Sequence, residues 1–251
     1  MSAPVFVCAE AADATAGSVL TLAGAEARHA ITVQRRRVGE AVDLVDGAGT
    51  RASAHIVSVH DGHLEAVVER ISHDADPQIT LVQALAKGGR DEQAVEGATE
   101  LGVTEVIPWA AERSIVQWRG PKVDKALAQW RARVLAAAKQ SRRAFVPHVN
   151  PLVTSADLAR SIGEATAAGV CVLVLHESAT TPLTTAVTDG ATGPVWLIVG
   201  PEGGITDGEV AAFTAAGALS VRLGPHVLRA SSAGPAAIAA LAAVRGTWAT
   251  A

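Results

Sequence analysis

The segment Trp196-Leu-Ile-Val-Gly-Pro-Glu-Gly-Gly204 joins a short apolar run to a loop of glycine and proline. A second segment, Val221-Arg-Leu-Gly-Pro-His-Val-Leu-Arg229, repeats this pattern. Each run is short and rich in branched residues, and a helix signal follows it, so both loops are predicted at the carboxyl ends of neighbouring parallel strands. Open α/β sheets bind ligands at such ends. We therefore expect the two loops to form one binding site.

Apolar runs and helical stretches alternate from Pro77 onward. The predicted strands are Ile79–Ala86, Val103–Pro108, Val170–His176, Val195–Val199 and Ala218–Leu223. The predicted helices are Asp91–Leu101, Val123–Ser141, Ala156–Ala168, Thr206–Ala216 and Ser232–Arg245. Thr206 and Glu209 have the spacing of a capping box, which begins a helix directly after the first glycine loop. This alternation predicts an α/β domain with a mostly parallel sheet covered by helices.

The first part of the chain has a different period. Strands are predicted at Val42–Val45, Ala52–Val59 and His63–Ile71, and Asp61-Gly62 between the last two indicates a hairpin. The polar stretch that ends at Pro77 breaks the pattern. We expect a small β domain over residues 1–73 and the α/β domain over residues 74–251.

Composition excludes several classes of protein. An apolar fraction of 49% and 251 residues allow a substantial core. Cys8 and Cys171 are far apart in sequence, which fits neither a disulfide framework nor a zinc site, so no metal is expected and a reducing cytoplasm is the expected location. No signal-peptide pattern and no run near the roughly 18 apolar residues of a membrane span is present, so a membrane location is not expected.

The net charge of −4 hides two basic clusters. The first contains Arg28, His29, Arg35, Arg36 and Arg37, and the second contains Arg131, Arg133, Lys139, Arg142 and Arg143. Patches rather than totals govern the attraction of phosphate. The clusters therefore favour a nucleic-acid partner.

The glycine loops do not carry a nucleotide-binding motif. Neither Gly-x-x-x-x-Gly-Lys-Ser/Thr nor Gly-x-Gly-x-x-Gly follows a predicted strand, and Glu202 would repel a phosphate. A cationic ligand with many hydrogen-bonding edges fits better, because glycines let backbone groups approach closely and Glu202 adds an acceptor. S-adenosylmethionine has both properties, and Leu223, Val227 and Leu228 supply apolar contact for an adenine.

Six segments together resemble one family. They are Val199–Gly204, Leu223–Arg229, Lys87-Gly-Gly-Arg90, Ala98–Val103, Ile107-Pro108 and Glu112-Arg-Ser114. In their order and spacing along the chain they are similar to the bacterial 16S ribosomal RNA uracil-N3 methyltransferases of the SPOUT superfamily. The resemblance implies a SPOUT-type α/β-knot (trefoil knot) domain after an N-terminal PUA-like β-barrel. It also implies a homodimer that methylates the uridine numbered 1498 in 16S RNA of the small ribosomal subunit, with S-adenosylmethionine as cofactor.

The same resemblance implies three cofactor loops. Their residues are Leu175, His176, Glu177, Val199, Gly200, Pro201, Glu202, Gly203, Gly204, Leu223, Gly224, Pro225, Val227, Leu228 and Arg229. We interpret Glu202 as a structural residue that pairs with a charge or with nearby amides. His176 and His226 are interpreted as pocket lining, and most tryptophans as core or interface residues.

Arg229 is the first candidate catalytic residue. Uracil N3 must lose a proton, and a fixed cation stabilises the anion that develops on the ring. The alternative is that Arg229 forms a salt bridge or holds RNA phosphate. Family members usually carry a Thr-Glu-Thr-like triplet next, whereas this chain has Ala230-Ser231-Ser232. Either Ser231 or Ser232 orients the base, or water takes the proton, and one serine also fits as the N-cap of the last helix.

Eight residues are predicted to bind RNA: Arg28, His29, Arg35, Arg37, Lys87, Arg90, Gln140 and Arg143. For the first cluster the alternative is a solvated strand edge. In the segment Lys139-Gln-Ser-Arg-Arg143, Lys139 and Arg142 replace the family's usual Glu and Gly. The alternative to RNA binding for this segment is that its cations complement the dipole at a helix C-terminus. Two other functions stay open: an RNA-binding or ribosome-assembly module without catalysis, and a related methyltransferase that acts on transfer RNA.

Overall fold

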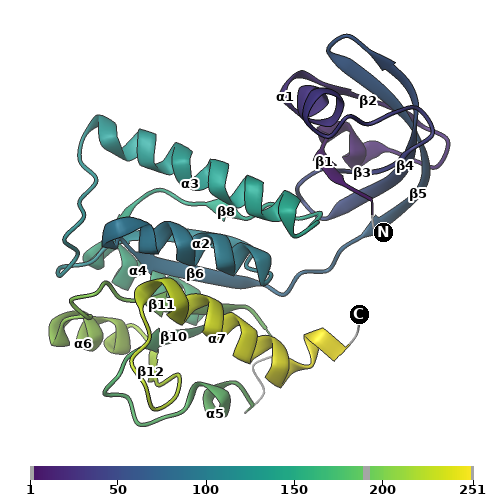
Figure 1. Ribbon diagram of the computed structural model, residues 1–251. Helices are drawn as coiled ribbons and strands as arrows, with labels where there is room; N and C mark the ends of the chain where they lie inside the picture. Colours follow the sequence, from purple (N-terminus) through teal and green to yellow (C-terminus); the bar gives the residue numbers. More distant parts are fainter. Residues whose placement is uncertain (1–2, 189–192, 250–251) are drawn as a thin grey trace. The chain divides into compact units, whose positions relative to one another are not determined.

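The computed structural model describes residues 3–188 and 193–249 (Figure 1). The chain forms two compact units, residues 1–76 with 135–146, and residues 77–134 with 147–251. The segment 135–146 joins the first unit through backbone hydrogen bonds: the Gly49 amide donates to the Ala144 carbonyl at 3.2 Å and the Val146 amide to the Gly47 carbonyl at 2.9 Å. The domain predicted from the sequence, residues 1–73, does not include this segment.

The first unit contains a five-stranded sheet. Its strands are β1 (Val5–Val7), β2 (Val19–Ala23), β3 (Ala41–Val45), β4 (Thr50–His60) and β5 (His63–His73), in the order β1-β3-β4-β5-β2. Gly62 has a φ of 85° between β4 and β5, which confirms the hairpin. Alternate residues of the strands, including Leu44, Ile56 and Leu64, form a buried core.

Short helical elements complete this unit. Helix α1 (Gly24–Arg28) continues into a π-helix (His29–Val33), and a 3₁₀ turn covers Ala9–Asp13. Arg28 and His29 therefore lie on helices, and the alternative of a strand edge is wrong for them. The sequence did not reveal these elements because five residues are too few to show a helical period.

The second unit contains a seven-stranded sheet in which every pairing is parallel. Its strands are β6 (Ile79–Ala84), β7 (Glu105–Ala110), β8 (His148–Val149), β9 (Val153–Thr154), β10 (Cys171–Leu175), β11 (Val195–Val199) and β12 (Leu219–Val221). The order is β12-β10-β11-β6-β7-β8, and β9 also pairs with β7. The predicted parallel α/β sheet is confirmed. Strand β7 begins later than expected because the Val103 amide donates to Ala98 in the turn that ends the preceding helix.

Helices cover both faces of this sheet (Figure 1). The helices of this part of the chain are α2 (Arg90–Glu100), α3 (Pro121–Gln140), α4 (Ser155–Ala167), α5 (Leu183–Thr188), α6 (Asp207–Ala215) and α7 (Ala230–Arg245), with 3₁₀ turns at Lys87–Gly89 and Thr247–Ala249. Leu158 of α4 and Phe213 of α6 pack in the core cluster on one face. Helix α7 lies on the other face, where Gly234 approaches Leu81 of β6. Thr206 and Glu209 form the predicted capping box of α6.

Trp109 and Trp130 are the largest buried side chains. The Trp109 indole donates to Ser155 Oγ at 3.1 Å and packs edge-on against Phe213. These two tryptophans are core residues, as expected, whereas Trp248 is exposed. Over residues 3–188 and 193–249, no helix combines the length and the apolar character needed to cross a membrane.

Candidate active site

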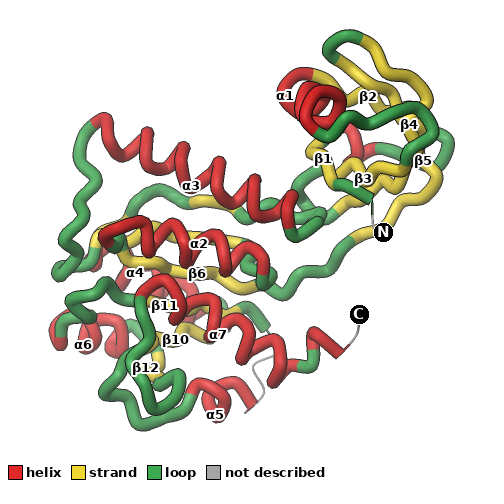
Figure 2. The backbone as a smooth tube through the Cα atoms, in the orientation of Figure 1, coloured by secondary structure: helices red, strands yellow, loops and turns green. Residues whose placement is uncertain are grey.

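Three loops meet at one edge of the parallel sheet. Leu175, the last residue of β10, is in register with Val199, the last residue of β11, and with Val221, the last residue of β12. The segments that follow, 176–177, 200–204 and 222–229, are therefore brought together, as the sequence predicted. Figure 2 shows these connections as loops between the strands and the next helices.

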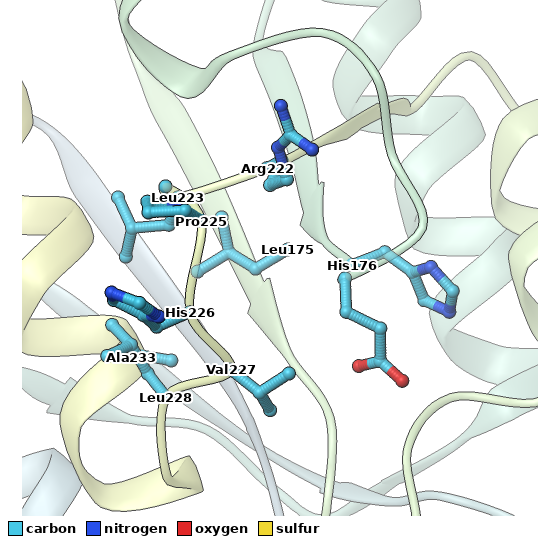
Figure 3. Close-up of a pocket in the computed structure, with 11 residues that line it drawn as sticks. Leu175, His176, Arg222, Leu223, Pro225, His226, Val227, Leu228 and Ala233 are labelled. Carbon is cyan, nitrogen blue, oxygen red and sulfur yellow. The ribbon is translucent and has the colours of Figure 1, made fainter.

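Two adjoining cavities lie between these loops, with volumes of about 370 Å³ and 150 Å³. The larger is lined by Arg90, Leu175, His176, Glu177, Val199, Gly200, Pro201, Glu202, Gly203, Gly204, Ile205, Val227, Leu228, Arg229, Ala230 and Ala233. The smaller shares Leu175–Glu177, Val227, Leu228 and Ala233, and adds Arg222, Leu223, Gly224, Pro225 and His226 (Figure 3). Every residue predicted for the cofactor loops lines one cavity or the other.

Several lining residues were missed by sequence reasoning. Ile205, Arg222, Ala230 and Ala233 were not predicted there, and Arg90 was assigned to RNA only. Ala230 and Ala233 are three residues apart in α7, so they lie on one helix face. The predicted helix began at Ser232, so this spacing gave no signal for Ala230. Nothing in the sequence marks Arg222 either.

The loop 200–204 is held firmly by its neighbours. Glu202 Oε1 accepts hydrogen bonds from Arg90 Nη1 at 2.8 Å and from the Lys87 amide at 3.2 Å. Glu202 thus pairs with a cation and with an amide of its surroundings. Arg113 Nη1 donates to the Gly203 carbonyl at 3.2 Å. A Cβ on Gly200 would lie 2.6 Å from Ile205 Cγ1, so the close turn at this position requires glycine.

Glu209 connects this loop to the rest of the sheet edge. Its side chain is buried and accepts hydrogen bonds from Ser155 Oγ at 2.6 Å, from the Glu112 amide at 2.8 Å and from the Thr206 amide at 2.9 Å. Burial raises the pKa of Glu209, but these hydrogen bonds outweigh it and leave the pKa below its ordinary value. The ionised carboxylate therefore holds the start of α6, directly after the loop, in place.

Arg229 is exposed at the larger cavity and forms the N-cap of α7. Its carbonyl accepts from the Ser232 amide at 2.8 Å and from the Ala233 amide at 3.0 Å. The expected N-cap at Ser231 or Ser232 is wrong, because the helix begins before both serines. In the part of the chain that the structure describes, no ion pair engages Arg229. Ser231 is half-buried, and the two cavities are lined without it.

The residues predicted to bind RNA fall into different environments. Arg28, Arg35, Arg37, Lys87 and Gln140 are exposed. His29 is half-buried and its Nε2 lies 3.0 Å from Gln34 Nε2. Arg143 is buried, with 9% exposure, and its Nη2 donates to Asp76 Oδ2 at 2.9 Å. Its environment is that of a structural ion pair.

Comparison with known proteins identifies the family. Residues 74–242 match the model of the RNA methyltransferase domain, and residues 22–69 match that of the RNA methyltransferase PUA domain. The chain is 44% identical over 234 residues to ribosomal RNA small subunit methyltransferase E of Mycobacterium tuberculosis, which covers 92% of this chain and 89% of the relative. The chain belongs to the ribosomal RNA small subunit methyltransferase E family. The resemblance, the enzyme class and an RNA partner are thereby confirmed.

Solved structures of similar proteins support the fold. Ribosomal RNA small subunit methyltransferase E from Neisseria gonorrhoeae, bound to S-adenosyl methionine, is 29% identical with a TM-score of 0.85, and the match covers 97% of this chain and 98% of that one. A Legionella pneumophila protein solved with SAM is 26% identical with a TM-score of 0.83, over 97% and 98% of the two chains. The predicted fold class, a SPOUT-type α/β domain after a PUA-like domain, is confirmed, while the knot stays a prediction.

Proposed function

We propose that this protein transfers the methyl group of S-adenosylmethionine to N3 of a uridine in 16S ribosomal RNA, at the position numbered 1498 in the family. The observation that carries the proposal is the meeting of three loops, after β10, β11 and β12, around adjoining cavities. The family relative from Neisseria gonorrhoeae was solved with the same methyl donor.

The residues around the cavities fit this donor. Leu175, Leu223 and Leu228 offer apolar contact to an adenine, and the backbone of Gly200–Gly204 offers donors and acceptors at close range. The Glu177 carboxylate is exposed and attracts a cationic sulfonium. When bound, the donor supplies an electrophilic methyl group.

Arg229 is the proposed catalytic residue. The target base must be unpaired or extruded to expose N3. As N3 loses its proton, negative charge spreads to the ring oxygens, and the guanidinium of Arg229 stabilises that charge. Ser231 lies in the first turn of α7, two residues after Arg229, and we propose that it orients the base or the water that takes the proton.

The RNA is proposed to contact the exposed cations of the first unit, Arg28, Arg35 and Arg37, together with Lys87 and Gln140. The substrate is the small ribosomal subunit or its RNA, which places the protein in the cytoplasm. A homodimer is proposed as the active form.

The proposal is tested with donor labelled on the methyl group. Wild-type protein is expected to label a uracil at N3 in small ribosomal subunits, and Arg229→Ala is expected to transfer methyl groups about 100-fold more slowly, as for the loss of one charge-stabilising group. Calorimetry with S-adenosylmethionine is expected to give similar affinities for both proteins. Arg160→Ala, which removes an exposed arginine of α4, is the matched control and should retain full transfer.

Three results separate the alternatives. Label in transfer RNA instead of ribosomal RNA would identify the related methyltransferase. Neither donor binding nor transfer by the wild-type protein would indicate an RNA-binding module without catalysis. Undiminished transfer by Arg229→Ala would remove Arg229 from the mechanism.

A further inference from the structure

Arg90 lines the larger cavity, of about 370 Å³, as the first residue of α2. Its side chain is 33% exposed, and its Nη1 donates to Glu202 Oε1 at 2.8 Å. A guanidinium has five N–H donors in a rigid fork. Among the described residues no other hydrogen bond or ion pair engages the Arg90 side chain, so most of its donors are available to a ligand in the cavity.

The larger cavity carries charges of both signs. Its lining includes the carboxylates of Glu177 and Glu202, the imidazole of His176 and two permanent cations, Arg90 and Arg229. S-adenosylmethionine brings a cationic sulfonium, an ammonium group and one carboxylate. A carboxylate that leaves water and lies near two others is unfavourable unless a cation pairs with it. The carboxylate of the donor therefore requires an arginine as its partner.

Arg90 differs from the other arginines at the two cavities in how firmly it is held. Arg222 and Arg229 are exposed, and no ion pair engages either of them in the part of the chain that the structure describes. Arg90 is half-buried and paired with Glu202. A guanidinium that is already fixed loses little freedom when it forms a charge-assisted hydrogen bond. Arg90 is therefore the best-prepared partner for the carboxylate of a small ligand.

The loop before Arg90 gives the side chain this position. Gly88 and Gly89 have φ values of 67° and 71°, and a Cβ on either would meet nothing within 4 Å. These glycines are required by the left-handed backbone and not by a lack of space. The turn that they make brings the Lys87 amide within 3.2 Å of Glu202 Oε1, so the backbone and a side chain of one loop hold the same carboxylate. The loop after β6 thereby places Arg90 at the cavity.

We propose that Arg90 binds the carboxylate in the amino-acid part of S-adenosylmethionine. The N–H donors that Glu202 leaves free form charge-assisted hydrogen bonds to the carboxylate oxygens. Glu202 is then a positioning residue, because it acts on the donor through Arg90. Arg90 has this role in place of the RNA contact that the sequence predicted. The proposal rests on the proposed function in so far as the methyl donor occupies these cavities.

The test compares two ligands of the full-length protein by calorimetry: S-adenosylmethionine and its decarboxylated form, which keeps the adenosine, the sulfonium and the amine. The wild type is expected to bind S-adenosylmethionine about 10-fold more tightly, as for one hydrogen bond between charged groups. Arg90→Ala should raise the Kd of S-adenosylmethionine about 10-fold and leave that of the decarboxylated form close to the wild-type value, which also shows that the variant is folded. Arg90→Lys keeps the charge without the fork and should recover part of the preference.

The matched control is Lys87→Ala, which removes one exposed cation from the same loop, while the two cavities are lined without it. The change in net charge is the same, so this variant should keep the wild-type preference between the two ligands. Equal affinities of the wild type for both ligands, an undiminished preference in Arg90→Ala, or an equal loss in Lys87→Ala would overturn the carboxylate contact. Methyl transfer is measured separately: wild-type protein that shows the preference but labels no uracil in small-subunit RNA overturns the proposed function and supports the role of Arg90.

Discussion

Glu209 is a buried residue that holds the segment directly after the glycine loop of the candidate active site. Its buried carboxylate joins α4, the segment after β7 and the start of α6 through hydrogen bonds from Ser155, Glu112 and Thr206. The sequence predicts its contact with Thr206 from the capping-box spacing. The contacts with Ser155 and Glu112 connect residues 54 and 97 positions apart, and only the fold brings them together.

We predict that Glu209→Gln lowers the free energy of unfolding by about 2 kcal/mol at pH 7, because charge-assisted hydrogen bonds are lost. The folded state lowers the pKa of Glu209 from its ordinary value of 4.5, so this stabilisation is present above that value and is lost as the pH falls through the folded-state pKa. Urea titrations at pH 7 and below pH 4 measure it. The difference in free energy of unfolding between Glu209→Gln and the wild type should narrow in acid. The control Glu100→Gln, at an exposed residue of α2, should have the same free energy of unfolding as the wild type. A difference in free energy of unfolding that is independent of pH would contradict the prediction.

At the scale of elements, the position of helix α7 is set by its close approach to the sheet. A Cβ built on Gly234 would lie 2.9 Å from Leu81 Cδ1, and Leu81 is fully buried. This contact positions the first turn of α7, from which Arg229 and Ala230 face the larger cavity. The sequence shows Gly234 as an unfavourable residue in a helix, and the sheet explains why it is there.

Gly234→Ala is predicted to destabilise the protein by about 1 kcal/mol, because the overlap with Leu81 outweighs the gain in helix propensity. Gly163→Ala in α4 makes the same change where no atom lies within 4 Å of the new Cβ, and it should stabilise by up to about 1 kcal/mol. Thermal unfolding of the two variants and the wild type checks both signs. Equal changes in Tm for Gly234→Ala and Gly163→Ala would show that packing against Leu81 does not set the position of α7.

At the scale of the whole molecule, the second unit has exposed apolar residues and a buried arginine without a partner among the described residues. Val227 is 78% exposed and Trp248 is 56% exposed, one beside the donor cavities and the other after α7. Arg245 Nε and Nη2 are buried and have no hydrogen-bond partner among the described residues. Burial lowers the pKa of Arg245, and an unpaired buried cation is unfavourable. The proposed homodimer would cover the apolar residues and pair this cation.

We therefore predict a mass near twice 25.6 kDa in sedimentation equilibrium at micromolar concentration. Val244→Glu, at a residue 38% exposed near the end of α7, should weaken the dimer and with it donor binding. Val57→Glu, at a residue 39% exposed on β4, is the matched control and should leave the dimer intact. A wild-type protein that sediments as a monomer would contradict the dimer.

The sequence by itself determined the succession of strands and helices in the α/β domain and the two glycine loops, because hydrophobic periodicity, turn residues and capping are local signals. The third loop, after Leu175, was expected only from the resemblance to the family. Sequence reasoning missed α1, α5, β8 and β9, which are too short to have a period. Only the tertiary structure decided that Arg90 pairs with Glu202 and that Arg143 pairs with Asp76. It alone also showed that Arg36, Lys139 and Arg142 line one cavity. The two ion pairs join residues 112 and 67 positions apart, and pairings at such separations leave no periodic signal in the chain.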